Sequence, residues 1–172
     1  MDLFEAIAKR HTYRGAFLPD PVPRSDLRQI LRAGIQAPNG CNAQTTSFVA
    51  VDVAAIIARI CSVLGSPAVP PALIVCVTRR QMVFKKMQFE VEDCCAATEN
   101  MLLAITALGY ASAWTDSTLR LGDRAARIGE ILAVPANLRV RVVLPIGRPA
   151  EAKQQAKRLP LDFRSSFNRY GS

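Results

Sequence analysis

Residues 10–14 have the sequence Arg-His-Thr-Tyr-Arg, and residues 37–44 have the sequence Ala-Pro-Asn-Gly-Cys-Asn-Ala-Gln. The first stretch holds two guanidinium groups, an imidazole and a hydroxyl, and a guanidinium is a forked, permanently charged group that suits a phosphate or a carboxylate. The second stretch carries carboxamides, which both donate and accept hydrogen bonds and so suit a ring edge with carbonyls and ring nitrogens. Taken alone, each stretch is better explained as an ordinary polar turn, since Asn-Gly is a common turn dipeptide.

Apolar side chains around these two stretches recur with the periods of helices and strands. Between Leu27 and Ile35 they are spaced as on one face of a helix, and Ser25 or Asp26 is expected to cap that helix. Gly109 is expected to end a long helix. The expected helices span residues 2–10, 25–35, 54–64, 87–108 and 122–132, and the expected strands span residues 47–53, 73–77, 110–115 and 139–146.

The C-terminal part of the chain, from about residue 148 to residue 172, is polar and basic and shows no strong periodic pattern. An arm of this length without a core of its own either frays or packs on another surface, such as a partner subunit. Together with the expected helices and strands, this predicts one α+β domain over residues 1–172 with an extended C-terminal arm.

The composition of the 172-residue chain is that of a folded intracellular protein, with half of its residues hydrophobic. A single histidine and the absence of a Cys-x-x-Cys pair argue against a zinc site, and most of the five cysteines are expected to be buried free thiols in a reducing compartment. No apolar run reaches the roughly 20 residues that span a bilayer, and the acidic start differs from a secretory signal. We therefore expect no membrane partner and a cytoplasmic location.

The formal net charge of +8 calls for an anionic partner. The lysines and arginines are spread along the chain, aromatic residues make up only 6%, and no nucleic-acid-binding motif is present. We therefore expect a phosphorylated small ligand and no nucleic acid.

The order and spacing of the motifs resemble the nitroreductase-like flavoprotein family. That family begins with a helix, an Arg-Arg/His-Ser/Thr-x-Arg/Lys motif, a Pro-rich connection and a second helix, and continues with an Ala-Pro-Ser-x-x-Asn-x-Gln loop that enters a strand. Residues 10–14 and 37–44 are similar to these two motifs. Residues 98–110 are similar to the family's long central helix with its Gly-aromatic exit, and residues 146–149 and 157–160 are similar to its last strand end and its basic tail.

The resemblance implies a mixed sheet flanked by helices, in a single domain that intertwines with a second copy as a homodimer. It also implies two FMN sites at the dimer interface, with residues 114–116 lining the isoalloxazine. The N-terminal motif and the basic tail would hold the phosphate, the ribityl chain and the pyrimidine edge, and the loop would approach from the other subunit. The implied FMN contacts are Arg10, His11, Thr12, Arg14, Pro38, Asn39, Gly40, Asn42, Lys157 and Arg158.

The activity implied by the resemblance is that of an FMN-dependent oxidoreductase. It would transfer hydride from NADH or NADPH through the flavin to a small organic acceptor, such as a nitroaromatic or a quinone, by a ping-pong mechanism. No catalytic side chain is expected, because the flavin carries the chemistry and the cationic site stabilises its reduced form. The same fold also serves flavin fragmentation and reductive dehalogenation, and a non-catalytic module that binds phosphoryl ligands or nucleic acid is the alternative from another class.

The chain departs from the family pattern in its loop and in the region that follows it. Asn39 stands where the family often has Ser, and Thr45 and Thr46 follow the loop Gln where the family has Pro. The region between Ser47 and Leu73 is short, which predicts a more open site or a different substrate. Cys41 is interpreted as incidental, with a redox-sensitive thiol as the alternative.

Overall fold

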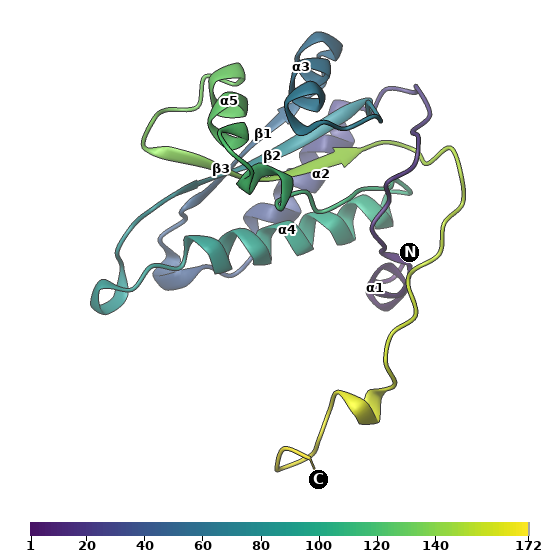
Figure 1. The fold of residues 1–172 in the computed structure, drawn as a ribbon. Coiled ribbons are helices and arrows are strands. Elements are labelled where there is room, and N and C mark those ends of the chain that lie inside the picture. The colour runs from purple at the N-terminus through teal and green to yellow at the C-terminus, as the bar shows by residue number, and fades with distance from the viewer. Residues whose placement is uncertain (172) are drawn as a thin grey trace.

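The computed structural model describes residues 1–171 and shows an antiparallel sheet covered by helices on both faces (Figure 1). Its three strands are β1 (Thr46–Val51), β2 (Ala72–Arg79) and β3 (Leu138–Ile146), arranged in the order β1-β2-β3. Residues 72–78 of β2 are all buried, because both faces of the central strand are covered. The expected strands 47–53, 73–77 and 139–146 are therefore confirmed with small shifts at their ends.

Helices pack on the two faces of the sheet as two layers. The helices α2 (Arg24–Ile35) and α4 (Glu90–Ala107) cover one face, and α3 (Ala54–Leu64) and α5 (Arg124–Ile131) cover the other (Figure 1). The first helix, α1 (Leu3–Lys9), lies against α4. Short 3₁₀ turns occur at Gly40–Asn42, Phe84–Lys86, Thr118–Arg120 and Leu161–Phe163.

The alternation of side chains along β2 divides the core into two clusters. Ile74 and Cys76 pack in the cluster beneath α2 and α4, whereas Leu73 and Val75 pack in the cluster beneath α3 and α5. Cys61, Cys76 and Cys94 are buried as expected, but Cys95, which also lies in an apolar segment, is exposed.

The start of α2 differs from its prediction. Pro23 occupies the N-cap position, and no side chain caps the helix. The carboxylate of Asp26, an expected cap, instead accepts a hydrogen bond of 2.7 Å from the hydroxyl of Tyr110. Pro23 offers no side-chain acceptor to the N–H groups of the first turn, and its carbonyl accepts the Asp26 and Leu27 N–H groups.

The expected strand 110–115 is also not formed as a strand. Gly109 ends α4 with a φ of +80°, as expected, and residues 111, 112 and 115 then make only isolated bridges. Ala111 and Thr115 pair with residues of β3 or just after it, whereas Ser112 pairs with Thr12 of the N-terminal segment. The segment thus pairs with the β3 region at two positions and with the N-terminal motif at a third, and in this way it joins the motif to the sheet.

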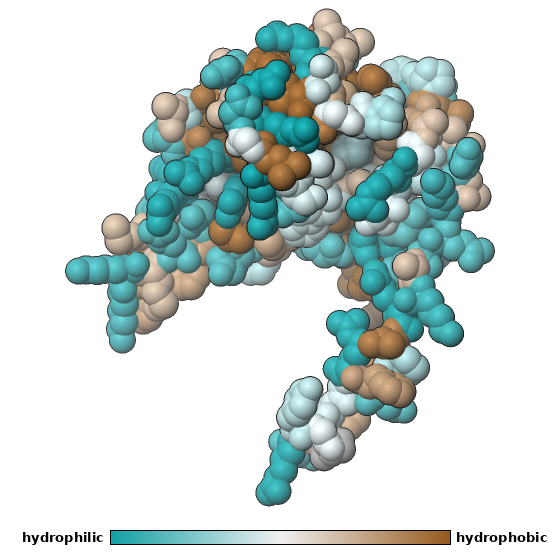
Figure 2. Space-filling view, in the orientation of Figure 1, coloured by the Kyte–Doolittle hydropathy of each residue, from teal (hydrophilic) through white to brown (hydrophobic). Residues whose placement is uncertain are grey.

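Apolar side chains remain exposed on the C-terminal arm and on α1. The arm projects from the body and carries apolar side chains among hydrophilic ones (Figures 1 and 2). Exposed large apolar residues on these elements are Leu3, Phe4, Ile7, Leu159, Leu161, Phe163 and Phe167. Within residues 1–171, no helix has the length and apolar character needed to cross a bilayer.

Candidate functional site

The N-terminal motif is anchored through its backbone and through Tyr13. The Tyr13 N–H donates to the Ser112 carbonyl at 2.8 Å, and the buried Tyr13 hydroxyl donates to the Ala16 carbonyl at 2.5 Å. With Tyr13 directed inward, Thr12 and Arg14 are exposed on either side of it. The segment therefore presents a hydroxyl and a guanidinium to a ligand from a fixed backbone.

Two polar atoms at this segment lack hydrogen-bond partners. The His11 Nδ1 lies 2.9 Å from the Lys9 carbonyl oxygen, but its Nε2 is buried without a partner among the described residues. The hydroxyl of the neighbouring Ser112 is buried and unpartnered in the same way. Buried polar atoms are costly when unsatisfied, so these two are suited to contact a ligand or a second chain.

The start of the C-terminal arm packs on the N-terminal motif. The Gln155 side-chain amide donates to the Arg10 carbonyl at 2.7 Å, and the Glu151 N–H donates to the Tyr13 hydroxyl at 3.4 Å. Lys157 and Arg158 lie two and three residues beyond Gln155 and are exposed. Three residues of extended chain span at most about 11 Å, so the basic pair lies within that backbone distance of Gln155. The structure thus anchors the start of the C-terminal arm at the N-terminal motif.

The charges of this region are mostly uncompensated. Arg10 lies 3.4 Å from the Glu99 carboxylate, whereas no ion pair within residues 1–171 involves Arg14, Lys157 or Arg158. Uncompensated cations of this kind favour an anionic ligand such as a phosphate dianion.

The loop at residues 38–44 has an unusual backbone. Cys41, Asn42 and Gln44 have φ values of +53°, +52° and +49°, in the left-handed region that residues other than glycine usually avoid. Pro38 and Asn42 are exposed, and Asn39 accepts a hydrogen bond of 2.9 Å from the Gln44 N–H through its side-chain oxygen. Strained backbone of this kind occurs at functional sites and persists only where neighbouring groups hold it.

Asp93 holds the loop in this conformation, and the sequence reasoning missed it. Its carboxylate accepts a 2.7 Å hydrogen bond from the Gly40 N–H and a 2.8 Å hydrogen bond from the Thr45 hydroxyl. Asp93 is only 5% exposed and lies in the first turn of α4, which it enters with two other acidic residues. A buried acid at the start of a long helix was the available signal, but its partners are 48 and 53 residues away in the sequence.

Within one chain, the loop and the N-terminal motif lie at different places along α4. The loop contacts α4 at Asp93, and the motif contacts it at Glu99, which is about 9 Å further along the helix axis. The cavity beside Pro38, Asn39 and Asp93 has a volume of about 90 Å³. A different cavity, of about 220 Å³, is lined by Tyr13 and Arg14.

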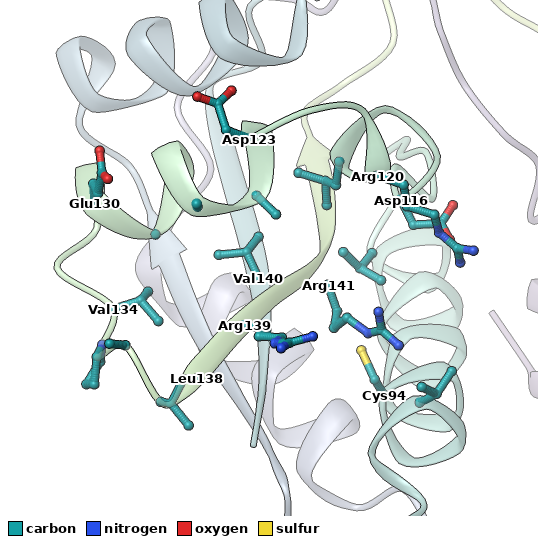
Figure 3. A pocket seen from close by; sticks show the side chains of 18 of the residues that line it. Cys94, Asp116, Arg120, Asp123, Glu130, Val134, Leu138, Arg139, Val140 and Arg141 are labelled. Carbon is teal, nitrogen blue, oxygen red and sulfur yellow. The ribbon is translucent and has the colours of Figure 1, made fainter. Parts of the chain in front are cut away.

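The segment 114–116 borders a third cavity, of about 730 Å³, between β3, α4 and α5 (Figure 3). Trp114 and Asp116 line it, and the Asp116 carboxylate pairs with Arg120 at 2.7 Å. Nearby, burial and the hydrogen bond to Asp26 raise the pKa of Tyr110, so this phenol remains a donor at neutral pH.

Comparison with known proteins identifies the family. The sequence profile described as the Nitroreductase family matches residues 7–81 and 71–148. A protein of Methanothermobacter thermautotrophicus, named "Putative NADH dehydrogenase/NAD(P)H nitroreductase", is 31% identical over 155 residues, which cover 88% of this chain and 79% of the relative.

Solved structures show the same fold. A Bacteroides thetaiotaomicron protein with the same name as the archaeal relative superposes with a TM-score of 0.84 at 24% identity and covers 98% of both chains. An FMN-dependent nitroreductase from Clostridium difficile superposes with a TM-score of 0.81 at 22% identity, over 97% of this chain and 99% of the other. The mixed arrangement of helices and sheet and the profile match over most of the sequence agree with the order of the motifs, and this chain therefore belongs to the nitroreductase family.

Proposed function

We propose that this protein is an FMN-dependent oxidoreductase that takes hydride from NADH or NADPH and delivers it to a small organic acceptor, such as a nitroaromatic or a quinone. The observation that carries the proposal is the packing of the basic arm on the N-terminal motif, through the 2.7 Å hydrogen bond from Gln155 to the Arg10 carbonyl. It supports the proposal because it anchors the arm that carries Lys157 and Arg158 at the segment that carries Arg10 and Arg14. Family membership and an FMN-dependent nitroreductase of the same fold support it.

The residues present fit FMN. Arg14, Lys157 and Arg158 are exposed without ion pairs within residues 1–171, so they are available to a phosphate dianion. The unpartnered Nε2 of His11 offers a further polar contact beside them. We propose that Arg10, Thr12 and these side chains hold the phosphate and the ribityl chain. Thr12 would supply a hydroxyl, and Arg10 would remain paired with Glu99.

The bound flavin would supply the hydride chemistry, accepting two electrons in one half-reaction and giving them up in the next, which gives a ping-pong mechanism. The side chains of this protein bind and orient. The cations would stabilise the phosphate and the negative charge that reduction adds to the ring. The His11 Nδ1 contacts the Lys9 carbonyl at 2.9 Å, which fixes the orientation of the imidazole.

We further propose that the active form is a homodimer in which Pro38, Asn39, Gly40 and Asn42 of one protomer complete the flavin site of its partner. The separation of the loop from the N-terminal motif along α4 supports this arrangement, because one chain leaves the two halves at different cavities. The exposed apolar side chains of α1 and of the arm provide surface for such an interface, for example Phe4 at 82% exposure and Phe163 at 79%.

The first test is a visible absorption spectrum of the purified protein, with mass identification of any cofactor released on denaturation. Anaerobic addition of NADH or NADPH is expected to bleach the flavin. A colourless protein that takes up no added FMN would contradict the proposal. A flavoprotein that neither nucleotide bleaches would instead favour flavin fragmentation or dehalogenation.

A pair of matched variants tests the placement of the phosphate. Arg14→Gln is expected to weaken FMN binding about tenfold or more, which corresponds to the loss of one hydrogen bond between charged groups. Arg28→Gln removes the same charge from an exposed position on α2 and is expected to leave the FMN affinity unchanged. Equal affinities of the two variants would refute the role of Arg14.

A further inference from the structure

The cavity of about 730 Å³ beside β3 is not used by the proposed flavin contacts, except at its border with residues 114–116. Apolar side chains form its walls, among them Leu119, Val134 and Leu138, with Trp114 at one end. Its volume lies within the range of small-molecule sites in proteins. The site therefore has room for a ligand with an apolar body.

A β-bulge in β3 places two arginines at this cavity. Cys76 pairs with Val142 and Val77 pairs with Val140, so Arg141 is the extra residue of β3. As a result, Val142 packs beneath α4 and Val140 packs beneath α5, although residues two apart share a face in a regular strand.

The same bulge sets the direction of both arginines. Arg139 pairs with Thr78, which lies on the same face of β2 as Cys76, and this face is covered by α4. Both arginine side chains line the cavity and extend toward α4, on the side where Cys94 lies (Figure 3). The cavity is thus lined by two guanidinium groups from one strand.

The two guanidinium groups are not neutralised. Within residues 1–171, neither the guanidinium group of Arg139 nor that of Arg141 forms a side-chain hydrogen bond or an ion pair. The Asp116 carboxylate is paired with Arg120, and the carboxylates of Asp123 and Glu130 point away from the two arginines (Figure 3).

The positive charge of Arg141 acts on a neighbouring thiol. The pKa of Cys94 is lowered, first by its hydrogen bond with Cys76 and then by Thr98 and the positive charge of Arg141, against the opposing effects of burial and of the negative charge of Asp116.

We propose that this cavity binds an organic anion whose carboxylate or phosphate group is held by Arg139 and Arg141 and whose apolar body contacts Trp114 and Leu119. Paired guanidinium groups match the two oxygens of such a head group, and the apolar walls select against small inorganic anions. A concave site with two free cations suits a small molecule better than a nucleic-acid backbone, which needs a longer charged track. The inference does not rest on the proposed FMN site, since it uses other cations.

Trp114 provides the readout, because it is the only tryptophan in the chain. The full-length protein, as purified, is titrated with 2-naphthoate, 2-naphthyl phosphate and the uncharged 2-naphthamide while Trp114 fluorescence is followed. At least one of the two anions is expected to bind about tenfold or more tightly than the amide, since a hydrogen bond to a charged group is at stake. The tighter of the two identifies the preferred head group. Equal binding of the amide and both anions would overturn the proposal.

Variants locate the anion at the two arginines. The double variant Arg139→Gln/Arg141→Gln is expected to lose the preference for the anion, and the single variant Arg139→Gln, at an exposed position, is expected to lose part of it while remaining folded. Arg127→Gln is the control, because it removes the same charge from α5 at a residue that does not line this cavity. A preference that survives in the variants of β3, or that falls equally in Arg127→Gln, would refute the site. The visible spectrum of the same samples reports flavin separately, so this outcome is distinct from a failure of the FMN proposal.

Discussion

An Asp93→Ala variant allows the strain in the 38–44 loop to be measured apart from the hydrogen bonds that hold the loop in place. The variant removes the acceptor of two hydrogen bonds, from the Gly40 N–H at 2.7 Å and from the Thr45 hydroxyl at 2.8 Å. Hydrogen bonds to a charged group contribute about 1.5–3 kcal/mol each, so together they contribute about 3–6 kcal/mol.

Strain in the loop offsets part of this contribution. Left-handed backbone costs about 1–2 kcal/mol per residue and less for asparagine, so Cys41, Asn42 and Gln44 together store about 2–4 kcal/mol. In the alanine variant the loop relaxes and releases this strain. The free energy of unfolding is therefore expected to fall by only about 1.5 kcal/mol, the difference between the midpoints of the two ranges.

The binding free energy of FMN at the partner subunit's proposed site should fall by more than the free energy of unfolding does. A relaxed loop must be returned to its bound conformation, which again requires about 2–4 kcal/mol and weakens FMN binding by at least about tenfold. Urea unfolding measures the first quantity, and titration of FMN into flavin-free protein measures the second. Glu92→Ala is the matched control, because Glu92 is an exposed acid in the same helical turn.

Two outcomes would refute the reasoning about Asp93. A loss of unfolding free energy of about 3–6 kcal/mol with unchanged FMN affinity would mean that the loop stores no strain and is not part of the site. Equal effects of Asp93→Ala and Glu92→Ala on FMN affinity would mean that the charge of the helix start matters and the two hydrogen bonds do not.

Two further predictions concern the arm and an ion pair. Tyr13→Phe removes the hydroxyl that joins Ala16 to Glu151. The unfolding free energy should fall by about 1 kcal/mol, and limited proteolysis of residues 150–171 should become faster. An unchanged cleavage rate would contradict this prediction. Asp52→Asn tests the exposed pair with Arg24, whose hydrogen bond lowers the pKa of Asp52. The small stabilisation from this pair should be present above about pH 4, be lost as the pH falls through the lowered pKa of Asp52, and decrease with added salt. If the wild-type protein remains more stable than the variant in urea at low pH, the prediction is refuted.

Local patterns in the sequence predicted most of the fold. The helix Ala54–Leu64 was predicted with its observed ends, because its apolar residues are dense, and Gly65 follows it with a φ of +67°. The segment 110–115 was wrongly predicted as a strand, because its residues pair with β3 at some positions and with the N-terminal segment at another. Ser25 and Asp26 are not caps because the helix begins earlier, at Arg24 with Pro23 at the N-cap, which places both residues inside its first turn.

For the candidate site, the sequence led to residues that are proposed to bind the flavin but not to the residues that support them. The motif at residues 10–14 was identified from its charge and from the family resemblance, and residues 157–158 from the resemblance alone. The structure places Gln155, two residues before Lys157, in hydrogen-bond contact with the Arg10 carbonyl, and the flavin contacts stay a prediction. Asp93 and the bulge at Arg141 were missed, since each depends on contacts between elements far apart in the sequence. Residue type indicates which ligand groups a side chain can bind, whereas the backbone groups that it holds in place are seen only in the folded structure.

The bulge in β3 also protects the molecule from self-association. β3 is an edge strand whose C-terminal half is covered by the bridges from Ala111 and Thr115, so its N-terminal half is the free edge. A free edge with regular backbone is a template on which another chain can add a strand and start an aggregate. The extra residue breaks the even spacing of N–H and C=O groups, and Arg139 and Arg141 bring like charges that would repel the same edge of a second molecule. Removal of one residue at the bulge would restore a regular edge, and the protein would become prone to aggregation through strand addition.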